Sequence, residues 1–351
     1  MGTASDSKKE YREIIEKIAE EAARQLREMA HPSAAKRGRN LVKRALHRPG
    51  VSGDRIFWPA GLLMLGLTEA GHTAEVEEYL EPWIRRGMSV QNPDDAVAGA
   101  VLLRLYEATG KECYHRAAEK ILDYLDQCRR DAKGAIVYGQ HSSNSWIYAD
   151  GTGQAAMLYA AAGRTEDALH QLNLYARYGT DESTGLPYHG YDESSGLCLG
   201  IIGWGRAAGW LMLGIAECAA NGMSGEKNTK EESLERFLRA MYERRRRDGL
   251  FSWQLDCRKG QLDTSAGGMI YYALQRMMQG EISQKAAGPF TQSDLDAAAK
   301  ALLEQTDAAG RVLQSSAECI DFAQYVQQYG TYPWGQGAVL AFLAAWQRSG
   351  E

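Results

Sequence analysis

The sequence lacks the patterns that mark several common kinds of functional site. None of its six cysteines forms a CxxC pair or another metal-ligand spacing, which argues against a zinc site and a disulfide-based fold. It contains no GxSxG elbow, no Walker loop, no GxGxxG after a strand and no HExxH helix. We therefore expect neither a metal nor a cofactor.

Long apolar runs and a strong charge imbalance are also missing. No stretch approaches the roughly 20 apolar residues of a membrane span, and the charged N-terminal segment lacks the apolar core of a secretory signal. The formal net charge is −5, which does not favour nucleic acid or an anionic membrane as a partner. We expect a cytoplasmic protein; the sequence carries no signal for an oligomeric state.

What the sequence does contain is helical periodicity over most of its 351 residues. Helices occur in pairs, at a spacing of roughly 45 to 60 residues. The first helix of each pair is apolar nearly all round, and the second carries one apolar stripe. Helices of the first kind are buried and helices of the second kind face solvent. Clear examples of the first kind are AGLLMLGL, AVAGAVLLRLY, GQAAMLYAAA, GRAAGWLMLGIA and GQGAVLAFLAAW.

Inner helices that alternate with outer ones predict an all-α protein, an (α/α)6 barrel of six hairpins, as a single domain over residues 1–351. An open solenoid of the TPR kind is the alternative. The long, irregular, aromatic-rich connections before the inner helices and the variable repeat length favour the closed barrel. A further helix is expected over residues 34–47, and short hairpin strands near Ala135–Gly139 and Gly249–Leu255.

The connections before the inner helices hold most of the polar and aromatic candidates for a site. In a toroid these connections meet at one mouth, so they predict a shared site. The candidates are Asp54, Phe57, Trp58, Asn92, Asp94, Asp95, His141, Trp146, Tyr148, Asp150, His189, Tyr191, Trp204, Arg206, Thr264, Ser265, Tyr332 and Trp334.

Three aspartates lie at predicted helix starts, where a carboxylate has two common roles: it caps the helix, or it takes part in catalysis. One of Asp94 and Asp95 is expected to cap a helix, and the other is free to point into the site. Asp150 lies between aromatic residues and an apolar helix, where removal from water favours the neutral carboxyl group that a general acid needs. We interpret Asp150 as catalytic rather than capping.

Two further residue types suit binding of a polar ligand. His189 lies in a Gly-Pro loop rather than on an apolar helical face, and His141 is a weaker candidate of the same kind. Arg206 stands between Trp204 and Trp210 in the sequence, where a guanidinium can clamp a carboxylate or stack on an indole.

Taken in order, these motifs resemble a known family. The segments NPDDAVAG, SWIYADG, GLPYHGYDESSG, GWGRAAGW, LDTSAGGMIYYAL and YPWGQGAVLAFLAAW are similar to those of the unsaturated glucuronyl and rhamnogalacturonyl hydrolases. These are glycoside hydrolase families 88 and 105, and the second is the closer match. The resemblance spans residues 50–348 and implies an (α/α)6 barrel acting on acidic oligosaccharides.

The resemblance also implies a reaction and roles for residues. The substrate would be a lyase-generated oligosaccharide of the rhamnogalacturonan or pectin type, with a 4,5-unsaturated uronic acid at its non-reducing end. Asp150 would be the general acid/base for hydration of the enol ether, and Asp94 the second aspartate. Substrate contacts would come from Trp58, His141, His189, Trp204, Arg206 and Trp210. Ala207 and Ala208 depart from the Gly-Asn pair common in the family, which bears on the substrate.

Two other functions remain open from the sequence. The first is a different (α/α)-barrel carbohydrate enzyme, such as an epimerase or an ordinary glycosidase. Epimerases of this architecture use several histidines at the mouth, and only His141 and His189 are available. The second is a non-enzymatic helical scaffold for peptides, for which the aromatic clustering would have no purpose.

Overall fold

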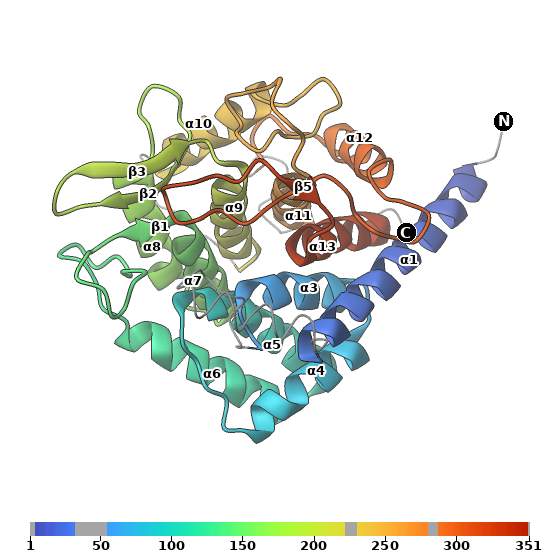
Figure 1. The fold of residues 1–351 in the computed structure, drawn as a ribbon, viewed down its shortest axis with the longest axis horizontal. Helices are drawn as coiled ribbons and strands as arrows, with labels where there is room; N and C mark the ends of the chain where they lie inside the picture. Colours follow the sequence, from blue (N-terminus) through green and yellow to red (C-terminus); the bar gives the residue numbers. More distant parts are fainter. Residues whose placement is uncertain (1–3, 32–54, 222–229, 280–286, 350–351) are drawn as a thin grey trace.

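The fold is an arrangement of helices in two concentric rings (Figure 1). The computed structural model describes residues 4–31, 55–221, 230–279 and 287–349. The helix expected over residues 34–47 and the candidate Asp54 lie outside these ranges. No helix of the described part combines the length and the apolar character needed to cross a bilayer.

Six helices of the described chain form the inner ring. Each packs against the next, and the last packs against the first, so the ring is closed. This confirms the predicted (α/α)6 barrel and shows that the open solenoid is wrong. The inner helices are α3 (Trp58–Glu69), α5 (Ala96–Thr109), α7 (Ala149–Ala161), α9 (Gly205–Ala220), α11 (Thr264–Gln279) and α13 (Pro333–Ser349).

The outer helices follow their inner partners along the chain, with one exception. They are α4 (Thr73–Arg85), α6 (Glu112–Gln127), α8 (Thr165–Tyr178), α10 (Lys230–Glu243) and α12 (Gln292–Leu303). The sixth outer helix is α1 (Ala4–Ala30), which packs against α13 and α3. Gln336, buried in α13, donates to the carbonyl oxygens of Ile18 at 2.9 Å and Gly310 at 2.8 Å. The first helix of the chain thereby pairs with the last.

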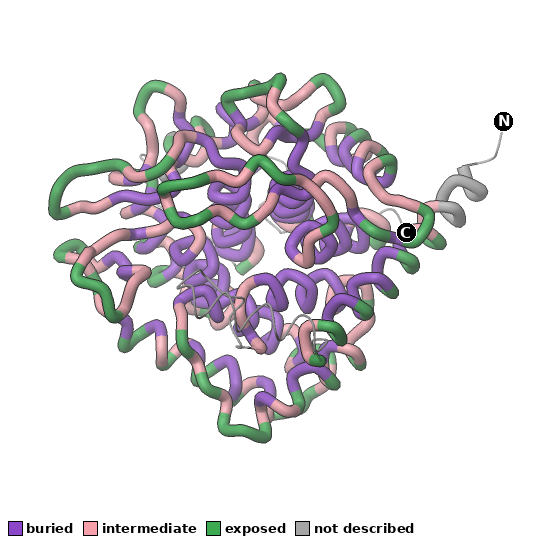
Figure 2. Tube along the Cα trace, in the orientation of Figure 1, coloured by how far each residue is buried: buried purple, intermediate pink, exposed green. Residues whose placement is uncertain are grey.

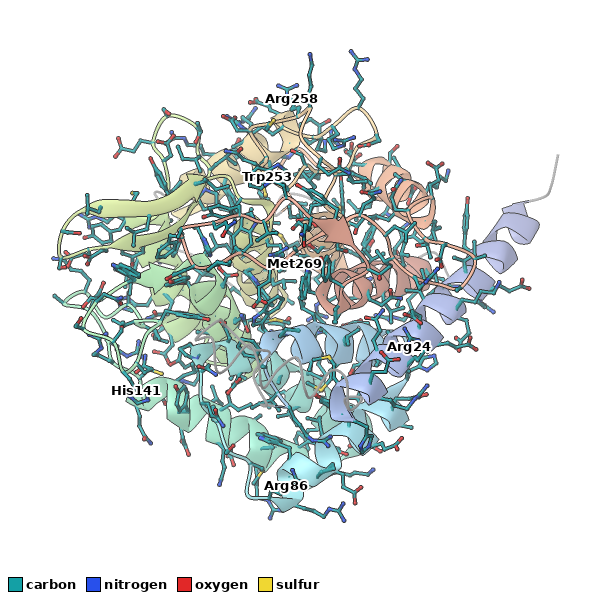
Figure 3. The ribbon with its side chains drawn as sticks, viewed as in Figure 1. Arg24, Arg86, His141, Trp253, Arg258 and Met269 are labelled. Atoms are coloured by element: carbon teal, nitrogen blue, oxygen red, sulfur yellow. The ribbon has the colours of Figure 1, made fainter. Side chains whose placement is uncertain are left out.

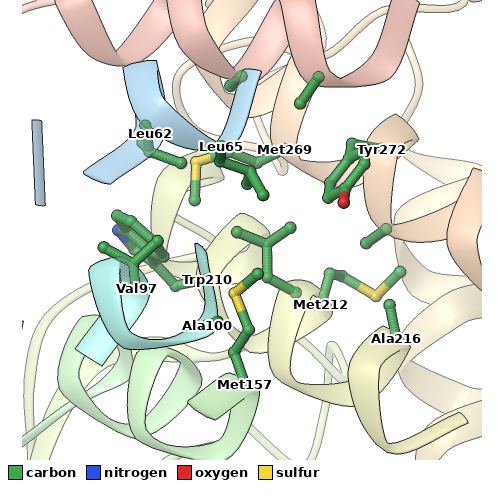
Figure 4. Close-up of a cluster of buried hydrophobic side chains, with 14 of the residues drawn as sticks. Leu62, Leu65, Val97, Ala100, Met157, Trp210, Met212, Ala216, Met269 and Tyr272 are labelled. Carbon is green, nitrogen blue, oxygen red and sulfur yellow. The ribbon is translucent and has the colours of Figure 1, made fainter. Parts of the chain in front are cut away.

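The centre of the ring is filled by side chains. Figure 2 shows that buried residues follow the inner helices, while the outer helices are buried on one side only. Leu62, Val97, Met157, Trp210 and Met269 come from five different inner helices and meet in one apolar cluster (Figure 4). Burial of these side chains, at about 1.5–3 kcal/mol each, is a main source of stability.

Neighbouring inner helices approach so closely that some contacts admit only glycine. A Cβ atom on Gly337 of α13 would lie 2.2 Å from the carbonyl oxygen of Leu62 in α3. That contact is backbone against backbone and cannot be relieved by a change of rotamer. Gly337 therefore permits the contact that closes the ring.

Gly337→Ala is expected to destabilise the protein by about 1–3 kcal/mol, because the added methyl group must push α3 and α13 apart. Gly267→Ala is the matched control, since its Cβ would meet only the Leu302 side chain at 3.8 Å. Removing a helical glycine there is expected to be neutral or to stabilise by about 0.5–1 kcal/mol. Urea unfolding of both variants measures the difference, and equal effects of the two would contradict this account of ring closure.

Two small sheets lie at the end of the barrel where the inner helices begin. The first consists of β1 (Ile147–Tyr148), β2 (Tyr188–Asp192) and β3 (Leu197–Ile202), antiparallel in that order. The second pairs β4 (Ser315–Ser316) with β5 (Tyr329–Gly330). The strands predicted near Ala135–Gly139 and Gly249–Leu255 are wrong, because these stretches make only isolated bridges. The true strand β2 has buried residues in succession rather than in alternation, so it carries no period-two signal.

Candidate active site

The paired aspartates before α5 have separate tasks. Asp95 Oδ2 accepts hydrogen bonds from the backbone N–H groups of Gln91 at 2.9 Å and Asn92 at 3.2 Å. Asp95 thus organises the turn into the short helix η1 (Pro93–Asp95). Asp94 is left to face α7. The expectation that one of the pair caps and the other faces inward agrees with this arrangement.

Asp94 is the most strongly perturbed carboxyl group of the site. Its side chain is 2 % exposed, with Tyr138 donating to Oδ2 at 2.5 Å and Gln154 donating to Oδ1 at 3.0 Å. Burial, followed by the negative charge of Asp150, raises the pKa of Asp94 to about 7. Near neutral pH Asp94 is therefore present in both its protonated and its ionised form.

Asp150 lies in the first turn of α7, close enough to Asp94 for their charges to interact. His189 Nε2 of β2 lies 3.2 Å from Asp150 Oδ2, at ion-pair distance. The two groups are not aligned as a hydrogen bond, and this oxygen has no hydrogen-bond partner among the described residues. A buried oxygen without a partner is unusual, and this marks Asp150 as a candidate for a functional role.

His189 is positioned by a strand and not by the Gly-Pro loop that the sequence suggested. It lies in β2, with its side chain 2 % exposed, and its ring is 4.3 Å from that of Trp204. The pairing of β2 with β1 determines the position of His189, because β1 ends just before Asp150 in the sequence. The sheet thereby brings His189 to the first turn of α7.

Gln154 and Tyr138 hold Asp94, and the sequence analysis missed both. Gln154 follows Asp150 by four residues on α7, so both side chains lie on one face of the helix. A glutamine inside the otherwise apolar segment GQAAMLYAAA was the available signal. Tyr138 lies in the long connection between α6 and α7, and nothing in the surrounding sequence indicates that it contacts Asp94. Burial, then the charge of Asp94, keeps the pKa of the Tyr138 hydroxyl well above its usual value, so it remains a donor.

The segment that joins β4 to β5, residues 317–328, was also missed; we name it the strap. It crosses the barrel end and reaches the β1–β2–β3 sheet (Figure 1). Phe322 stacks on Tyr148 at 4.3 Å and lies edge-on to His189 at 4.9 Å. The Tyr325 hydroxyl lies 2.9 Å from His189 Nδ1. The strap therefore covers the histidine from the side opposite the helix starts.

The predicted tryptophans and Arg206 form a continuous aromatic group. Trp58 contacts Trp210 at 6.2 Å and Trp334 at 5.1 Å between ring centroids. The Arg206 guanidinium lies over Trp204 at 4.7 Å and over Trp334 at 5.6 Å. The interpretation of Arg206 as a residue that stacks on indole therefore agrees with the structure.

The other interpretation of Arg206, a carboxylate clamp, receives no support. Its side chain is 1 % exposed. Nη1 donates to the carbonyl oxygen of Ser316 at 2.9 Å and to its Oγ at 2.5 Å, and Nη2 donates to the carbonyl oxygen of Ala317 at 2.9 Å. Most of its donors thus hold the start of the strap.

Two other predicted features lie apart from this group. His141 is exposed and stands at the edge of the molecule, whereas Met269 lies near the centre (Figure 3). Ala207 and Ala208 are fully buried in α9. A change of residue type at these two positions alters packing beneath the site rather than its surface.

A cavity of about 660 Å³ opens at the opposite end of the barrel, where the inner helices finish. It is lined by charged residues that pair with one another: Arg104 with Glu69 and Glu217, both at 2.8 Å, and Arg276 with Glu217 at 3.1 Å. Because these charges compensate one another, we interpret the residues around this cavity as an ion-pair network that holds the ends of the inner helices together. The candidate active site is the aspartate pair at the other end.

A closed double ring of helices with buried aspartates among aromatic side chains at one end is the arrangement expected of an (α/α)-barrel carbohydrate enzyme. The sequence profile of Glycosyl Hydrolase Family 88 matches residues 13–349. The chain therefore belongs to this family and is a glycoside hydrolase.

Individual relatives agree with this assignment. The chain is 28% identical over 311 residues to the unsaturated rhamnogalacturonyl hydrolase YesR of Bacillus subtilis, covering 82% of this chain and 88% of the relative. A possible GH105 member from Salmonella enterica has the same fold, with a TM-score of 0.79 at 15% identity over 98% of this chain and 95% of that one. The unsaturated glucuronyl hydrolase of Bacillus sp. GL1 aligns with a TM-score of 0.68 at 17% identity, over 95% and 96% of the two chains.

The buried Asp94 predicts a pH-dependent stability. The unfolded chain loses this proton near the ordinary pKa of 3.8, and the folded chain keeps it until about pH 7. The folded state therefore loses stability as pH rises between these values, by roughly 1.4 kcal/mol per pH unit. Asp94→Asn cannot ionise, so relative to the parent protein it should gain about 2 kcal/mol in unfolding free energy between pH 5 and pH 8.

Urea unfolding at the two pH values measures this gain. Asp123→Asn is the control, because Asp123 is exposed on the outer helix α6. It should show the same small difference from the parent at both pH values. If Asp94→Asn behaves in the same way as the control, the raised pKa of Asp94 is refuted.

Proposed function

We propose that this enzyme removes a 4,5-unsaturated uronic acid from the non-reducing end of acidic oligosaccharides by hydration of the enol ether. The observation that carries the proposal is the Asp150 carboxyl group, which has an oxygen without a hydrogen-bond partner in the described chain and lies beside Asp94 and His189. The family assignment and the names of the relatives support the same chemistry.

In this mechanism Asp150 acts first as an acid and then as a base. It gives its proton to C4 of the double bond, and positive charge develops on C5 and the ring oxygen. Water adds to C5 and returns a proton to Asp150, so the carboxyl group is regenerated. The resulting hemiketal opens to a C5 ketone, and the hemiacetal left at C1 breaks down to an aldehyde and the released sugar. One water is consumed for each sugar released.

Asp94 has the complementary role of holding the sugar. A second ionised carboxylate beside Asp150 would repel the charge that Asp150 acquires when it protonates C4. A pKa of about 7 allows Asp94 to be neutral for part of the time near pH 7, which reduces that repulsion. The neutral group can donate a hydrogen bond to a sugar hydroxyl and also accept one.

The aromatic residues supply faces for sugar rings. Trp58 is half-buried and so keeps exposed ring area, whereas Trp204 and Trp210 are 4 % and 1 % exposed. We assign stacking on the substrate to Trp58, with Trp204 and Trp210 supporting it from behind. Arg206 supports the strap, and His141 takes part only if a long substrate reaches the edge of the barrel.

The preferred substrate is the unsaturated disaccharide from rhamnogalacturonan. YesR, the relative with 28% identity, bears that specificity in its name. An unsaturated glucuronyl disaccharide is the second candidate, because the enzyme from Bacillus sp. GL1 shares the fold. A panel of lyase-generated disaccharides, followed by loss of the enol-ether ultraviolet absorbance, distinguishes the two.

Asp150→Asn is expected to lower kcat on the preferred disaccharide by at least about 100-fold, because general acid–base catalysis contributes roughly 10²–10⁴. The amide keeps the shape of the carboxyl group but cannot transfer the proton. The rate of absorbance loss measures the effect, and circular dichroism checks the fold.

Asp123→Asn on α6 again serves as the control and should retain the parent rate. Full activity of Asp150→Asn would rule out Asp150 as the acid/base. Absence of activity of the parent protein on every unsaturated disaccharide, with turnover of a saturated glycoside, would favour the ordinary glycosidase alternative.

A further inference from the structure

The strap places a tyrosine hydroxyl behind the histidine of the site. Tyr325 is half-buried, and its hydroxyl lies 2.9 Å from Nδ1 of His189. The same hydroxyl accepts the backbone N–H of Ile201 in β3 at 3.2 Å. Tyr325 therefore bridges the strap, the edge of the sheet and the far side of the His189 ring.

The hairpin is built to receive this contact. A Cβ atom on Gly200 would lie 2.4 Å from the Tyr325 hydroxyl, and one on Gly190 would lie 2.5 Å from the Phe322 ring. Gly200 also has a φ of +76°, which other residues rarely adopt. Because both positions are glycine, the strap can approach the hairpin closely beside His189 of β2.

Hydrogen-bond accounting favours one direction for the Tyr325–His189 contact. A phenol has one hydrogen to give and lone pairs to accept with. The Ile201 N–H uses a lone pair, and His189 Nδ1 is the acceptor placed to take the hydrogen. Burial raises the pKa of Tyr325 above its usual value, so the hydroxyl keeps that hydrogen.

We infer that Tyr325 is a positioning residue for the reaction: by donating to Nδ1, it holds His189 in the tautomer that carries its hydrogen on Nε2. Nε2 is the ring nitrogen nearest Asp150 Oδ2, 3.2 Å away, although the two atoms form no aligned hydrogen bond in this structure. A neutral histidine in the opposite tautomer would direct a lone pair at the carboxylate. The inference rests on the proposed function only for its kinetic consequence, since the tautomer is a property of the free enzyme.

The consequence for catalysis follows from geometry. In this tautomer His189 places an N–H group beside the Asp150 carboxyl group without adding a positive charge. When Asp150 has given up its proton, this N–H is available to the new carboxylate. Loss of the Tyr325 hydroxyl should misplace this donor, and small misplacements at a reacting group are costly in rate.

The test uses Tyr325→Phe in the full-length protein. Nitrogen-15 NMR of histidine-labelled enzyme should show Nδ1 of His189 unprotonated and Nε2 protonated in the parent, and a mixture of tautomers in the variant. His189→Gln identifies the resonance by its disappearance. On the preferred disaccharide, Tyr325→Phe should lower kcat about 10-fold and change KM by less than about 2-fold.

A double-mutant cycle separates positioning from a structural role. If Tyr325 acts through His189, Tyr325→Phe should have no further effect on kcat in the His189→Gln background. Tyr329→Phe is the matched control, since that hydroxyl donates only to Gln327, at 2.9 Å on the exposed side of the strap end. It should retain the parent kcat and the parent NMR spectrum.

Two outcomes would overturn the inference: an unchanged His189 tautomer in Tyr325→Phe, or an equal loss of kcat with and without His189. Failure of the proposed function looks different. In that case the parent protein would leave every unsaturated disaccharide intact, while the NMR measurement would still decide the role of Tyr325.

Discussion

Closure of the inner ring is the constraint on which the site depends. The first turns of α5, α7 and α9 carry Asp94, Asp150 and Arg206 or the residues beside them, and these turns converge only because the six inner helices run in one direction around a closed circle. Closure in turn requires backbone contact between α3 and α13, where Gly337 lies against Leu62. The chemistry at the barrel end therefore depends on small residues far from it in the sequence. Large apolar side chains fill the remaining central space and make the ring rigid.

The two ends of the barrel handle buried charge in opposite ways. At the end where the inner helices finish, Arg104 lies between Glu69 and Glu217, so these buried charges have partners of opposite sign. At the end that holds the candidate active site, Asp94 and Asp150 are like charges, and their main polar neighbours are Tyr138, Gln154 and His189. The first arrangement stabilises the ionised forms and holds helices together. The second leaves proton positions adjustable, which an acid/base site requires.

The sequence predicts the parts of this structure that depend on local pattern. Apolar-all-round helices alternating with striped ones were sufficient for the barrel, and an aspartate before an apolar helix was sufficient to nominate Asp150. The sequence could not separate Gln154, which binds Asp94, from Gln336, which binds the backbone of α1, because both occur in apolar helices of similar composition. The two glutamines differ in their hydrogen-bond partners only because a different segment lies beside each of them in the closed ring. The strand β2 was missed for a related reason: the strap covers it, and this removes the alternation that marks a half-exposed strand.

The strap also bears on the two roles that the sequence left open for Arg206, clamping a carboxylate or stacking on an indole. An arginine flanked by tryptophans in the sequence is suited to binding an anion. The same pattern is equally suited to an arginine that stacks on indole rings and holds a loop by hydrogen bonds. The structure distinguishes them by burial and by acceptors: Arg206 gives its donors to Ser316 and Ala317 at the start of the strap. Ser316 Oγ in turn donates to Asp263 at 2.7 Å, so the positive charge is balanced within the protein. With Arg206 fixing one end and Tyr325 joined to His189 near the other, the strap connects α9 to the candidate active site.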